Sequence, residues 1–480
     1  MNKKTNKKTD FSRREFLQNG ALAAASFMIV PRHVLGGKGF IAPSDKLNIA
    51  AVGCGGKGEV NIPLAFNNGS DNIVALCDVD DRQAKRFRTQ FPNTPYFKDY
   101  RKMLEAEAKN IDAVIVTTPD HMHYPIAMSA MQMGKHVYCE KPLTHDIWEA
   151  RKMTEGAAKY KVVTQMGNQG SSGKWTRIDE AIIQSGMIGE VHTVEVWTNR
   201  PVWPQGVKSP KDRGEKQPIP AEVDWDLWLG TAPYRDFHEA YMPFRWRGYW
   251  DYGTGALGDM GCHFMDVPFR ALKLGSPTSV ECSVGQVYAD FFKESFFDDS
   301  CPPSSAVHLK FPSKSANFKE ISLNWYDGGI RPALPEGCDF EKVFASQDGG
   351  VMFIGTKGIL AVELFGNNPK LFPTAKFENV KLPEPIRPLV ENNEVGHQQQ
   401  WVKACKAGFG SYTSSSFDQS GPLTETVLMG NLATRSFLLR ENGKFTGRKK
   451  LLWDGANMKI TNFDAANAFV KREYRAGGWI

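Results

Sequence analysis

The sequence predicts an α/β protein whose first half forms a doubly wound parallel sheet. Short apolar runs alternate there with helix-compatible segments, as in KLNIAAVG, NIVALCDVD, IDAVIVTTP and KHVYCEKP. Strands and helices that alternate at this spacing pair as a parallel sheet with helices on both faces. A glycine-rich turn follows the first run, and polar residues follow the others. Because such a sheet binds its ligands at the carboxyl ends of its strands, these turns are where we expect a site.

Length and charge exclude some classes of partner. The chain has 480 residues, of which 41% are hydrophobic, enough for two or three domains with well-packed cores. The net charge of +6 comes from the first 40 residues, which hold eight basic and two acidic side chains. Removing these from the totals of 59 and 53 leaves 51 of each sign in the rest. The body therefore has no basic field, and we expect no nucleic-acid partner.

The first 40 residues have the parts of an export signal. A lysine-rich start and the stretch SRREFL precede the apolar run ALAAASFMIV, whose ten residues are too few to span a bilayer. The paired arginines resemble a twin-arginine (Tat) signal, whose machinery exports proteins already folded. Eight scattered cysteines without a C-x-x-C pair fit folding in the reducing cytoplasm before export. We expect a periplasmic protein; cleavage of the signal, or its retention as an anchor, stays open.

The turn after the first apolar run carries the pattern Gly53-x-Gly55-x-x-Gly58. In a dinucleotide-binding turn, the first glycine makes the tight turn, the second lets the backbone approach a pyrophosphate, and the third lets the helix pack on the strand. The next run ends at Asp78, where such folds place the acid that accepts from the adenosine ribose hydroxyls. A carboxylate there repels a 2′-phosphate, so the sequence favours NAD, and Arg82 keeps NADP open as an alternative.

The later strand ends supply further cofactor-binding candidates. They are Thr117 and Pro119 after the third run, His123 beyond them, and Glu140 and Lys141 after the fourth. We expect His123 to line the nicotinamide side of the pocket. Glu140 is either the partner of Lys141 or a charge at a helix N-terminus. Lys141 precedes a proline, which restricts its backbone and so aims its ammonium. A cation beside a substrate hydroxyl stabilises the alkoxide that develops during alcohol oxidation.

The motifs GxGxxG, TPDHMH, EKP and LGDMGCH occur in the order and at the spacing of the Gfo/Idh/MocA family of sugar and cyclitol oxidoreductases. The sequence resembles this family specifically from about residue 46 to 275. The resemblance implies an NAD(P)-binding Rossmann domain at 45–165, then an α/β domain at 166–480 with a large open, mainly antiparallel sheet.

The resemblance also implies site residues. The family's EKP lysine falls on Lys141, and its later D-x-x-x-H pair falls on Asp259 and His263. It further implies that the peptide bond between Lys141 and Pro142 is cis. We therefore expect Lys141, Asp259 and His263 to be the catalytic residues.

Asp259 and His263 lie shortly before Pro268. Proline deep in a helix removes a hydrogen bond and clashes with the preceding turn, so we expect a helix to begin near residues 262–264. His263 would then lie at a helix N-terminus, where the dipole disfavours imidazolium and keeps a neutral ring available as a general base. Asp259 could cap the helix, orient the histidine or bind a neighbouring hydroxyl.

The same stretch could supply metal ligands, because residues 259, 263 and 266 would share one face of a helix. It is not an H-E-x-x-H motif, however, and the glycine-rich run before it favours close approach of a cofactor or substrate. We predict no metal, with a zinc site completed by His121, His123 or His145 as the open alternative.

Beyond about residue 163 the pattern changes to an amphipathic helix, TRIDEAIIQSGMIG, and a series of strand-like segments. These segments are EVHTVEVWTN, TSVECSVGQVYAD, SAVHLKF, EISLNWY and VMFIGTKGILAVELF. The last contains the turn Thr356-Lys357-Gly358, which predicts a hairpin.

Candidate substrate contacts come from this second part. Seven of the twelve tryptophans lie between residues 175 and 250. Aromatic rings stack on sugar C–H faces and arginines bind hydroxyls, so we expect the cluster around Trp246 and Arg247 to form a substrate wall. Asn168 and Gln169 follow a strand and are predicted to bind substrate hydroxyls, with a purely structural turn as the alternative.

Together these features predict an NAD-dependent oxidoreductase acting on a secondary hydroxyl of a sugar, glycoside or cyclitol. Because a periplasm offers little free NAD, we expect a tightly held nicotinamide to receive the hydride. Two alternatives stay open: a redox-assisted glycoside hydrolase or epimerase of the same fold, and a non-catalytic protein that senses sugar and nucleotide. An open sheet face also predicts a homo-oligomer.

Overall fold

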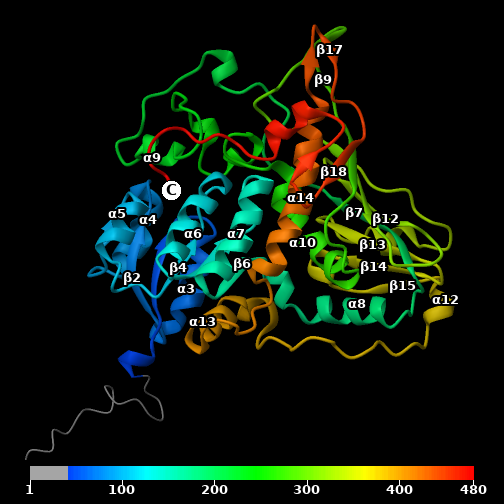
Figure 1. Ribbon diagram of the computed structural model, residues 1–480, viewed down its shortest axis with the longest axis horizontal. Coiled ribbons are helices and arrows are strands. Elements are labelled where there is room, and N and C mark those ends of the chain that lie inside the picture. The colour runs from blue at the N-terminus through cyan, green and yellow to red at the C-terminus, as the bar shows by residue number, and fades with distance from the viewer. Residues whose placement is uncertain (1–41) are drawn as a thin grey trace, which may run out of the picture. The chain divides into compact units, whose positions relative to one another are not determined.

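A six-stranded parallel sheet forms the first part of the structure (Figure 1). The computed structural model describes residues 42–480, and residues 47–480 form one unit. The predicted export signal at 1–40 lies outside the described residues. The strand order is β3-β2-β1-β4-β5-β6, with every neighbouring pair parallel, which confirms the predicted Rossmann sheet. The strands are β1 (Asn48–Val52), β2 (Asn72–Cys77), β3 (Tyr96–Phe97), β4 (Ala113–Val116), β5 (His136–Glu140) and β6 (Thr164–Gly167).

Helices cover both faces of this sheet. In β1, Ala50 and Val52 belong to one hydrophobic core, whereas Ile49 and Ala51 belong to another. A strand that is buried on both faces reads as a continuous apolar run, as it does here. The covering helices are α3 (Gly58–Phe66), α4 (Asp81–Gln90), α5 (Tyr100–Ala106), α6 (His123–Gln132) and α7 (Ile147–Tyr160).

A helix from the second half of the chain completes one face. Helix α13 (His397–Ala407) packs on α3, and its Trp401 is fully buried in the core around Ile49 and Ala51. The core on this face of the nucleotide-binding sheet therefore includes residues from well beyond the predicted domain boundary near residue 165.

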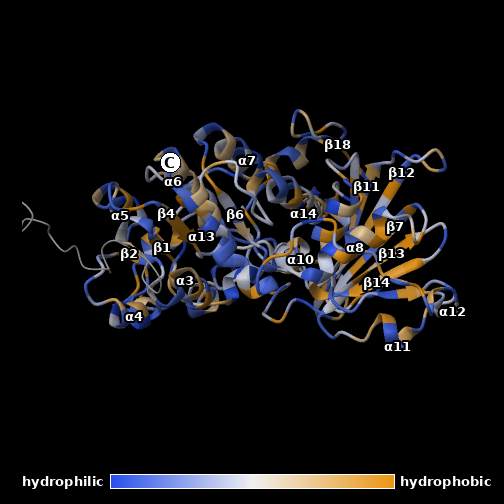
Figure 2. Ribbon diagram, turned by 90° about the horizontal axis from the view of Figure 1, so that it is seen from below, coloured by the Kyte–Doolittle hydropathy of each residue, from blue (hydrophilic) through white to orange (hydrophobic). Residues whose placement is uncertain are grey.

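A nine-stranded sheet forms the second part, in the order β15-β14-β13-β7-β12-β11-β8-β18-β19. Within the described chain its neighbours are antiparallel except β7 and β12, which confirms the predicted mainly antiparallel sheet. The hairpin predicted at residues 356–358 joins β13 to β14, and Figure 2 shows hydrophobic residues concentrated along these two strands. The strands are β7 (Val191–Thr198), β8 (Ser279–Val284), β11 (Ser305–Pro312), β12 (Glu320–Tyr326), β13 (Gly349–Gly355), β14 (Ile359–Glu363), β15 (Lys370–Phe372), β18 (Leu451–Asp454) and β19 (Lys459–Ile460).

Smaller elements stand outside the two large sheets. The predicted segment TSVECSVGQVYAD divides into β8 and β9, and β9 pairs with β10 in a separate hairpin. These elements are β9 (Val287–Asp290), β10 (Lys293–Ser295), β16 (Arg440–Glu441), β17 (Lys444–Phe445), α9 (Trp225–Leu229), α11 (Phe340–Val343) and α12 (Thr374–Phe377). Among the helices of residues 42–480, none combines the length and apolarity needed to cross a membrane.

Three helices pack between the two sheets or beside them: α8 (Lys174–Gln184), α10 (Gly255–Ala271) and α14 (Phe417–Phe437). The prediction that a helix begins near residues 262–264 is wrong, because α10 begins at Gly255 and contains Pro268. Fifteen of its seventeen residues are buried, so tertiary packing outweighs the local cost of the proline. Gly261 lets α10 approach α14, since a Cβ there would lie 2.8 Å from Val427.

Two segments from the second part return to the nucleotide-binding sheet. The segment 199–254, which joins β7 to α10, forms a bridge between Val223 and Asp80. The Asp224 amide also donates to the Val79 carbonyl oxygen at 2.8 Å. The C-terminal tail follows, and Figure 1 shows its end beside α9 and near α5. Both segments thus lie at the edge where the parallel strands end.

Candidate active site

A cavity of about 610 Å³ lies at the carboxyl ends of the parallel strands. It is bounded by the glycine-rich turn, by the ends of β2, β4 and β5, by the segment 199–254 and by α10. Of the residues predicted from sequence, it is lined by Gly53, Gly55, Asp78, Thr117, Pro119, His123, Glu140, Lys141, Gln169, Trp246, Arg247 and His263. The structure therefore gathers most of the predicted cofactor, catalytic and substrate residues around one space.

The glycine-rich turn fits a dinucleotide. Gly53 has φ +87°, and a Cβ there would lie 2.6 Å from the Thr117 carbonyl oxygen, so only glycine makes this turn. A Cβ on Gly58 would overlap the Gly53 carbonyl oxygen, which leaves the start of α3 tight against β1. The space beside Gly55, predicted to admit a pyrophosphate, holds the Gln83 side chain. The N-terminal end of α3 faces this turn, where backbone N–H groups and the helix dipole favour phosphate.

Asp78 is positioned as a hydrogen-bond acceptor at the end of β2. Its carboxylate accepts from the Cys54 amide at 2.7 Å and the Asp80 amide at 2.9 Å, while burial raises its pKa to about 6. Arg82, which kept NADP open, instead makes two hydrogen bonds to Asp80 at 2.8 and 2.7 Å. With this arginine engaged by another carboxylate, the adenosine end fits NAD better than NADP.

The loops after β4 and β5 are tied together by His123. Its Nδ1 lies 2.8 Å from the Pro142 carbonyl oxygen and its Nε2 lies 2.8 Å from the Thr118 carbonyl oxygen. Thr117 donates through its hydroxyl to the Gly53 carbonyl oxygen. Both residues therefore shape the cavity, and their polar side-chain atoms are hydrogen-bonded to backbone carbonyl oxygens.

Glu140 is not the side-chain partner of Lys141. Its Oε1 accepts from the Asn61 side chain in the first turn of α3 at 2.8 Å. Of the two roles left open for Glu140, the structure thus favours the one beside a helix N-terminal turn. The Lys141–Pro142 peptide bond is cis, as the resemblance implies.

Lys141, at the cavity wall, forms a largely buried ion pair with Asp259. The Lys141 ammonium donates to Asp259 Oδ1 at 2.7 Å and to the Asp259 carbonyl oxygen at 2.6 Å. Arg247 Nε donates to the same carboxylate oxygen at 3.3 Å. These cations hold the pKa of Asp259 well below its usual range despite burial. Because an ammonium has three N–H donors, Lys141 keeps one for a ligand oxygen.

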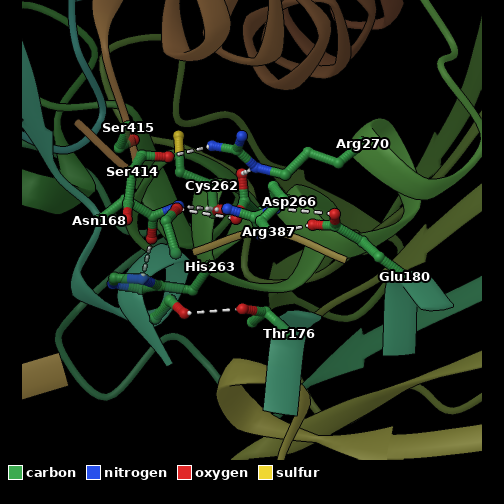
Figure 3. Close-up of polar contacts among 12 residues, drawn as sticks. Asn168, Thr176, Glu180, Cys262, His263, Asp266, Arg270, Arg387, Ser414 and Ser415 are labelled. Carbon is green, nitrogen blue, oxygen red and sulfur yellow. Dashed lines mark hydrogen bonds and ion pairs between the residues drawn. The ribbon is translucent and has the colours of Figure 1, made fainter. Parts of the chain in front are cut away.

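His263 is held in one tautomer by Asn168. The Asn168 amide nitrogen donates to the Cys262 carbonyl oxygen at 2.9 Å, so its Oδ1, 2.6 Å from His263 Nδ1, is the acceptor (Figure 3). His263 Nδ1 therefore carries the proton, and Nε2 keeps a lone pair. Burial first, and then the Lys141 charge, lowers the pKa of His263 well below its ordinary value. The ring is neutral, but not for the expected reason, because it lies in the third turn of α10 rather than at a helix N-terminus.

The two residues predicted to bind substrate hydroxyls behave differently. Asn168 is buried behind His263 and is not among the residues that line the cavity, so the structure favours a positioning role for it. Gln169 lines the cavity; its amide oxygen accepts from Lys57 Nζ and its nitrogen donates to the Gly167 carbonyl oxygen, each at 3.0 Å.

Behind Asn168 lies a polar network that stiffens the site (Figure 3). Ser171 donates to Asp266 at 2.7 Å, and Asp266 also accepts from Arg270 at 2.8 Å. Ser171 in turn accepts from the Asn168 amide at 3.2 Å. Buried polar groups that are satisfied in this way fix one arrangement.

Part of the predicted aromatic cluster lines the cavity on the side of the segment 199–254. The Arg247 guanidinium lies 4.3 Å from the ring centroids of both Phe244 and Trp246, and all three residues line the cavity. This surface offers apolar rings and a cation beside Lys141, which suits a polyhydroxylated ligand.

Several cavity residues were missed from the sequence, and three of them have side chains that bear on the chemistry or on ligand binding. Lys57 lies inside the glycine motif, and Asp120 lies inside TPDHMH, where its position between the predicted residues could have drawn attention to it. Burial raises the pKa of Asp120, which accepts a hydrogen bond from Thr254. Trp479 lines the cavity from the far end of the chain, and no pattern in the sequence announces this contact.

Metal ligation finds no geometric support in the part of the chain that the structure describes. No three His, Cys, Asp or Glu side chains within residues 42–480 come together in a way that could hold a metal ion. His121, one of the alternative zinc ligands, has its Nε2 3.1 Å from the Trp228 carbonyl oxygen.

Two protein-family models match the chain. "Oxidoreductase family, NAD-binding Rossmann fold" matches residues 47–168, and "Oxidoreductase family, C-terminal alpha/beta domain" matches residues 175–292. Both describe the family that the motifs resemble, and together they cover half of the chain.

Individual relatives are distant. The chain is 24% identical over 159 residues to the myo-inositol 2-dehydrogenase of Thermotoga maritima, covering 33% of this chain and 47% of that protein. It is 25% identical over 203 residues to a glycosyl hydrolase family 109 protein of Shewanella pealeana, covering 38% of this chain and 44% of that protein. The chain thus spans less than half the length of these curated relatives.

A solved structure supports the fold. The WlbA dehydrogenase from Bordetella pertussis, solved with NADH and UDP-GlcNAcA, aligns with a TM-score of 0.53 over 81% of this chain and 97% of that chain. At 16% sequence identity, this likeness shows that the two chains share a fold.

Proposed function

We propose that this chain, which belongs to the Gfo/Idh/MocA family of oxidoreductases, oxidises a secondary hydroxyl of a sugar, glycoside or cyclitol with NAD. One observation carries the proposal. Lys141 and His263, whose Nε2 is left without a proton, line one cavity together with a glycine-rich turn that has the geometry of a dinucleotide-binding turn.

The nucleotide would be held by residues on the parallel sheet. The turn at Gly53 and the start of α3 would receive the pyrophosphate, and the Asp78 carboxylate would accept from the adenosine ribose hydroxyls. When bound, the nicotinamide supplies a hydride acceptor beside the substrate carbon. His123 and Thr117 keep the adjoining loops in place through the backbone contacts described above.

Residues of the protein would accept the hydroxyl proton that the oxidation releases. Oxidation of an alcohol releases the hydroxyl proton as the carbon loses a hydride. His263 Nε2 would take that proton, since its Nδ1 proton is already committed to Asn168. Lys141 would donate its remaining N–H to the substrate oxygen and stabilise the developing alkoxide. Asp259 holds the ammonium at that point, and Arg247 shares the same carboxylate.

The substrate class follows from the lining of the cavity. Phe244 and Trp246 provide ring faces for sugar C–H groups, while Arg247 and Gln169 provide polar contacts. The relative named myo-inositol 2-dehydrogenase is consistent with a polyhydroxylated ring as substrate.

The direct test is to denature the purified protein and identify the nucleotide that it releases, and then to supply a panel of sugars and cyclitols and follow NADH. We expect NAD, and NADH formation matched by a ketone product. Lys141→Ala and His263→Ala variants should bind NAD and lose turnover. If both variants bind NAD and keep full activity, the site assignment is wrong; a wild-type protein that binds no nicotinamide nucleotide would refute the function itself.

A second candidate is a redox-assisted glycoside hydrolase, favoured by the likeness to the glycosyl hydrolase family 109 protein. In that reaction, transient oxidation of the sugar acidifies a neighbouring C–H and permits elimination of the aglycone before re-reduction. Release of the aglycone with catalytic NAD and no net NADH would favour this candidate over the dehydrogenase. A protein that binds nucleotide and sugar but shows neither reaction would support the non-catalytic alternative.

The cellular location and the oligomeric state of the protein are also proposals. A folded protein exported by the twin-arginine route would carry its nucleotide with it, and the open nine-stranded sheet offers a face for a second copy of the chain. Fractionation of cells expressing the full chain tests the first point, and light scattering tests the second.

A further inference from the structure

The C-terminal tail crosses from the second domain onto the nucleotide-binding domain. The partly buried Arg472 donates to Glu149 at the start of α7 at 2.8 Å, and to the His121 carbonyl oxygen at 2.6 Å. Further on, the Arg475 amide donates to the Thr231 carbonyl oxygen at 3.0 Å. These contacts fix the tail along the edge of the cavity before its last residues are reached.

The end of the tail is anchored beside α5. The Tyr100 hydroxyl donates to the Trp479 carbonyl oxygen at 2.5 Å, and the Arg101 guanidinium lies 4.4 Å from the centroid of the Trp479 ring. Gly478 has φ +62°, and a Cβ on Gly477 would lie 2.7 Å from the indole nitrogen. The two glycines thus let the chain fold back so that the indole packs against its own backbone.

The indole of Trp479 belongs to the cavity wall. Its side chain is only 5% exposed and lines the cavity together with Tyr100 and Asp99. Within the described residues its Nε1–H is buried and has no hydrogen-bond partner. Because this nitrogen is shielded, a ligand in the cavity would meet the ring of Trp479 rather than its N–H.

The position of Trp479 identifies which part of the ligand it would meet. Tyr100 and Asp99 follow β3, which pairs with β2, and β2 leads directly into Asp78. Asp78 lies where the adenosine ribose would bind, whereas Lys141 and His263 lie where the nicotinamide and the substrate would react. Trp479 therefore lies on the adenosine side of the cavity.

We propose that Trp479 is a cofactor-binding residue whose ring packs on the adenine of the dinucleotide. The tail from Arg472 to Trp479 then acts as a strap over the nucleotide, so that release requires the strap to undock. The proposal rests on the proposed function only in requiring that the cavity bind a dinucleotide. It supplies a structural reason for the tight retention that an exported oxidoreductase needs.

The experiment measures nucleotide release from the full-length protein rather than turnover. Wild-type protein and the Trp479→Phe and Trp479→Ala variants are loaded with NADH, chased with excess NAD and followed by NADH fluorescence. Because stacking of a base on an aromatic ring contributes about 1–3 kcal/mol, release from Trp479→Ala should be roughly five- to 150-fold faster. Trp479→Phe keeps a smaller ring and should lie between the two.

A matched control separates this effect from loss of folding. Trp453 is also buried, at 8% exposed, and does not line the cavity. Trp453→Ala should lower the melting temperature and leave the release rate of the folded protein unchanged. Equal release rates from wild type and a folded Trp479→Ala would overturn the proposal while leaving the proposed function intact. A variant that does not fold is replaced by removal of residues 477–480, which must also speed release. Wild-type protein that binds no NADH would refute both.

Discussion

The hydrogen bond between Asn168 and His263 gives the sharpest prediction about the reaction. In Asn168→Ala, His263 Nδ1 loses its acceptor at 2.6 Å, and the ring is free to carry its proton on Nε2 instead. That tautomer presents a donor to the substrate hydroxyl and cannot accept its proton. A buried hydrogen bond left unmade costs about 1–3 kcal/mol, so we expect kcat to fall roughly five- to 150-fold.

The assay is steady-state NADH formation across a range of pH, with nucleotide binding measured separately. Asn168 does not line the cavity, so KM and nucleotide affinity should change little while kcat falls. Burial and Lys141 lower the pKa of His263, so wild-type activity should persist below about pH 6.5, the ordinary pKa of a histidine, and be lost only as the ring becomes protonated.

Asn168→Asp is the matched control. An aspartate retains an acceptor for Nδ1–H but adds a negative charge, which favours imidazolium and should raise the pKa of His263. We expect most of kcat to be retained at high pH and the acidic limb of the profile to move upward. If Asn168→Ala keeps the wild-type kcat and pH profile, or if the aspartate variant is as impaired as the alanine variant at every pH, the tautomer argument is wrong.

Three further results follow from the site. Lys141→Ala should lower kcat about 10²- to 10³-fold, the usual cost of removing a donor to a developing oxyanion, with NADH affinity measured by fluorescence unchanged. Asp78→Ala should weaken NAD binding in calorimetry about ten- to 100-fold, since hydrogen bonds to a charged group contribute about 1.5–3 kcal/mol; an unchanged affinity would remove Asp78 from the adenosine site. Gly58→Ala should lower the unfolding free energy by about 1–3 kcal/mol in urea denaturation, because its Cβ would overlap the Gly53 carbonyl oxygen. The control is Ala65→Gly in the same helix, which lowers the helix propensity and removes one buried methyl group without any overlap, and should cost about 1–2 kcal/mol.

The parallel sheet could be predicted from sequence because its strands are buried on both faces. When helices separate continuous apolar runs such as AVIV in β4, these runs indicate strands of a parallel sheet that is covered on both faces. The strand ends follow from the same pattern, which is why the amino-acid sequence alone points to Gly53, Asp78 and Lys141. The link between the EKP and D-x-x-x-H motifs came from the resemblance to a known family. Their residues Lys141 and Asp259 lie 118 positions apart in the sequence and form an ion pair in the structure.

What could not be predicted depends on packing between distant segments. Local sequence around Pro268 favours a short helix, whereas α10 extends over seventeen residues because nearly all of them are buried against neighbours. Asn168 looked like a substrate ligand because strand ends usually face a ligand, and only the structure shows its amide turned toward Cys262 and His263. No pattern in the sequence pointed to Trp479, because its contact with the cavity depends on where the C-terminal tail packs.

The residues that we propose for the reaction come from both domains. Lys141 follows a strand of the parallel sheet, whereas Asp259 and His263 lie on α10, which packs beside the antiparallel sheet. The Lys141–Asp259 ion pair therefore joins the two domains, and neither domain alone holds both the cation and the proton acceptor that we propose. A buried pair of this kind is unfavourable when one partner is missing. The ion pair thus couples correct domain packing to a correctly placed ammonium, so small shifts of α10 should reduce kcat before they reduce nucleotide binding.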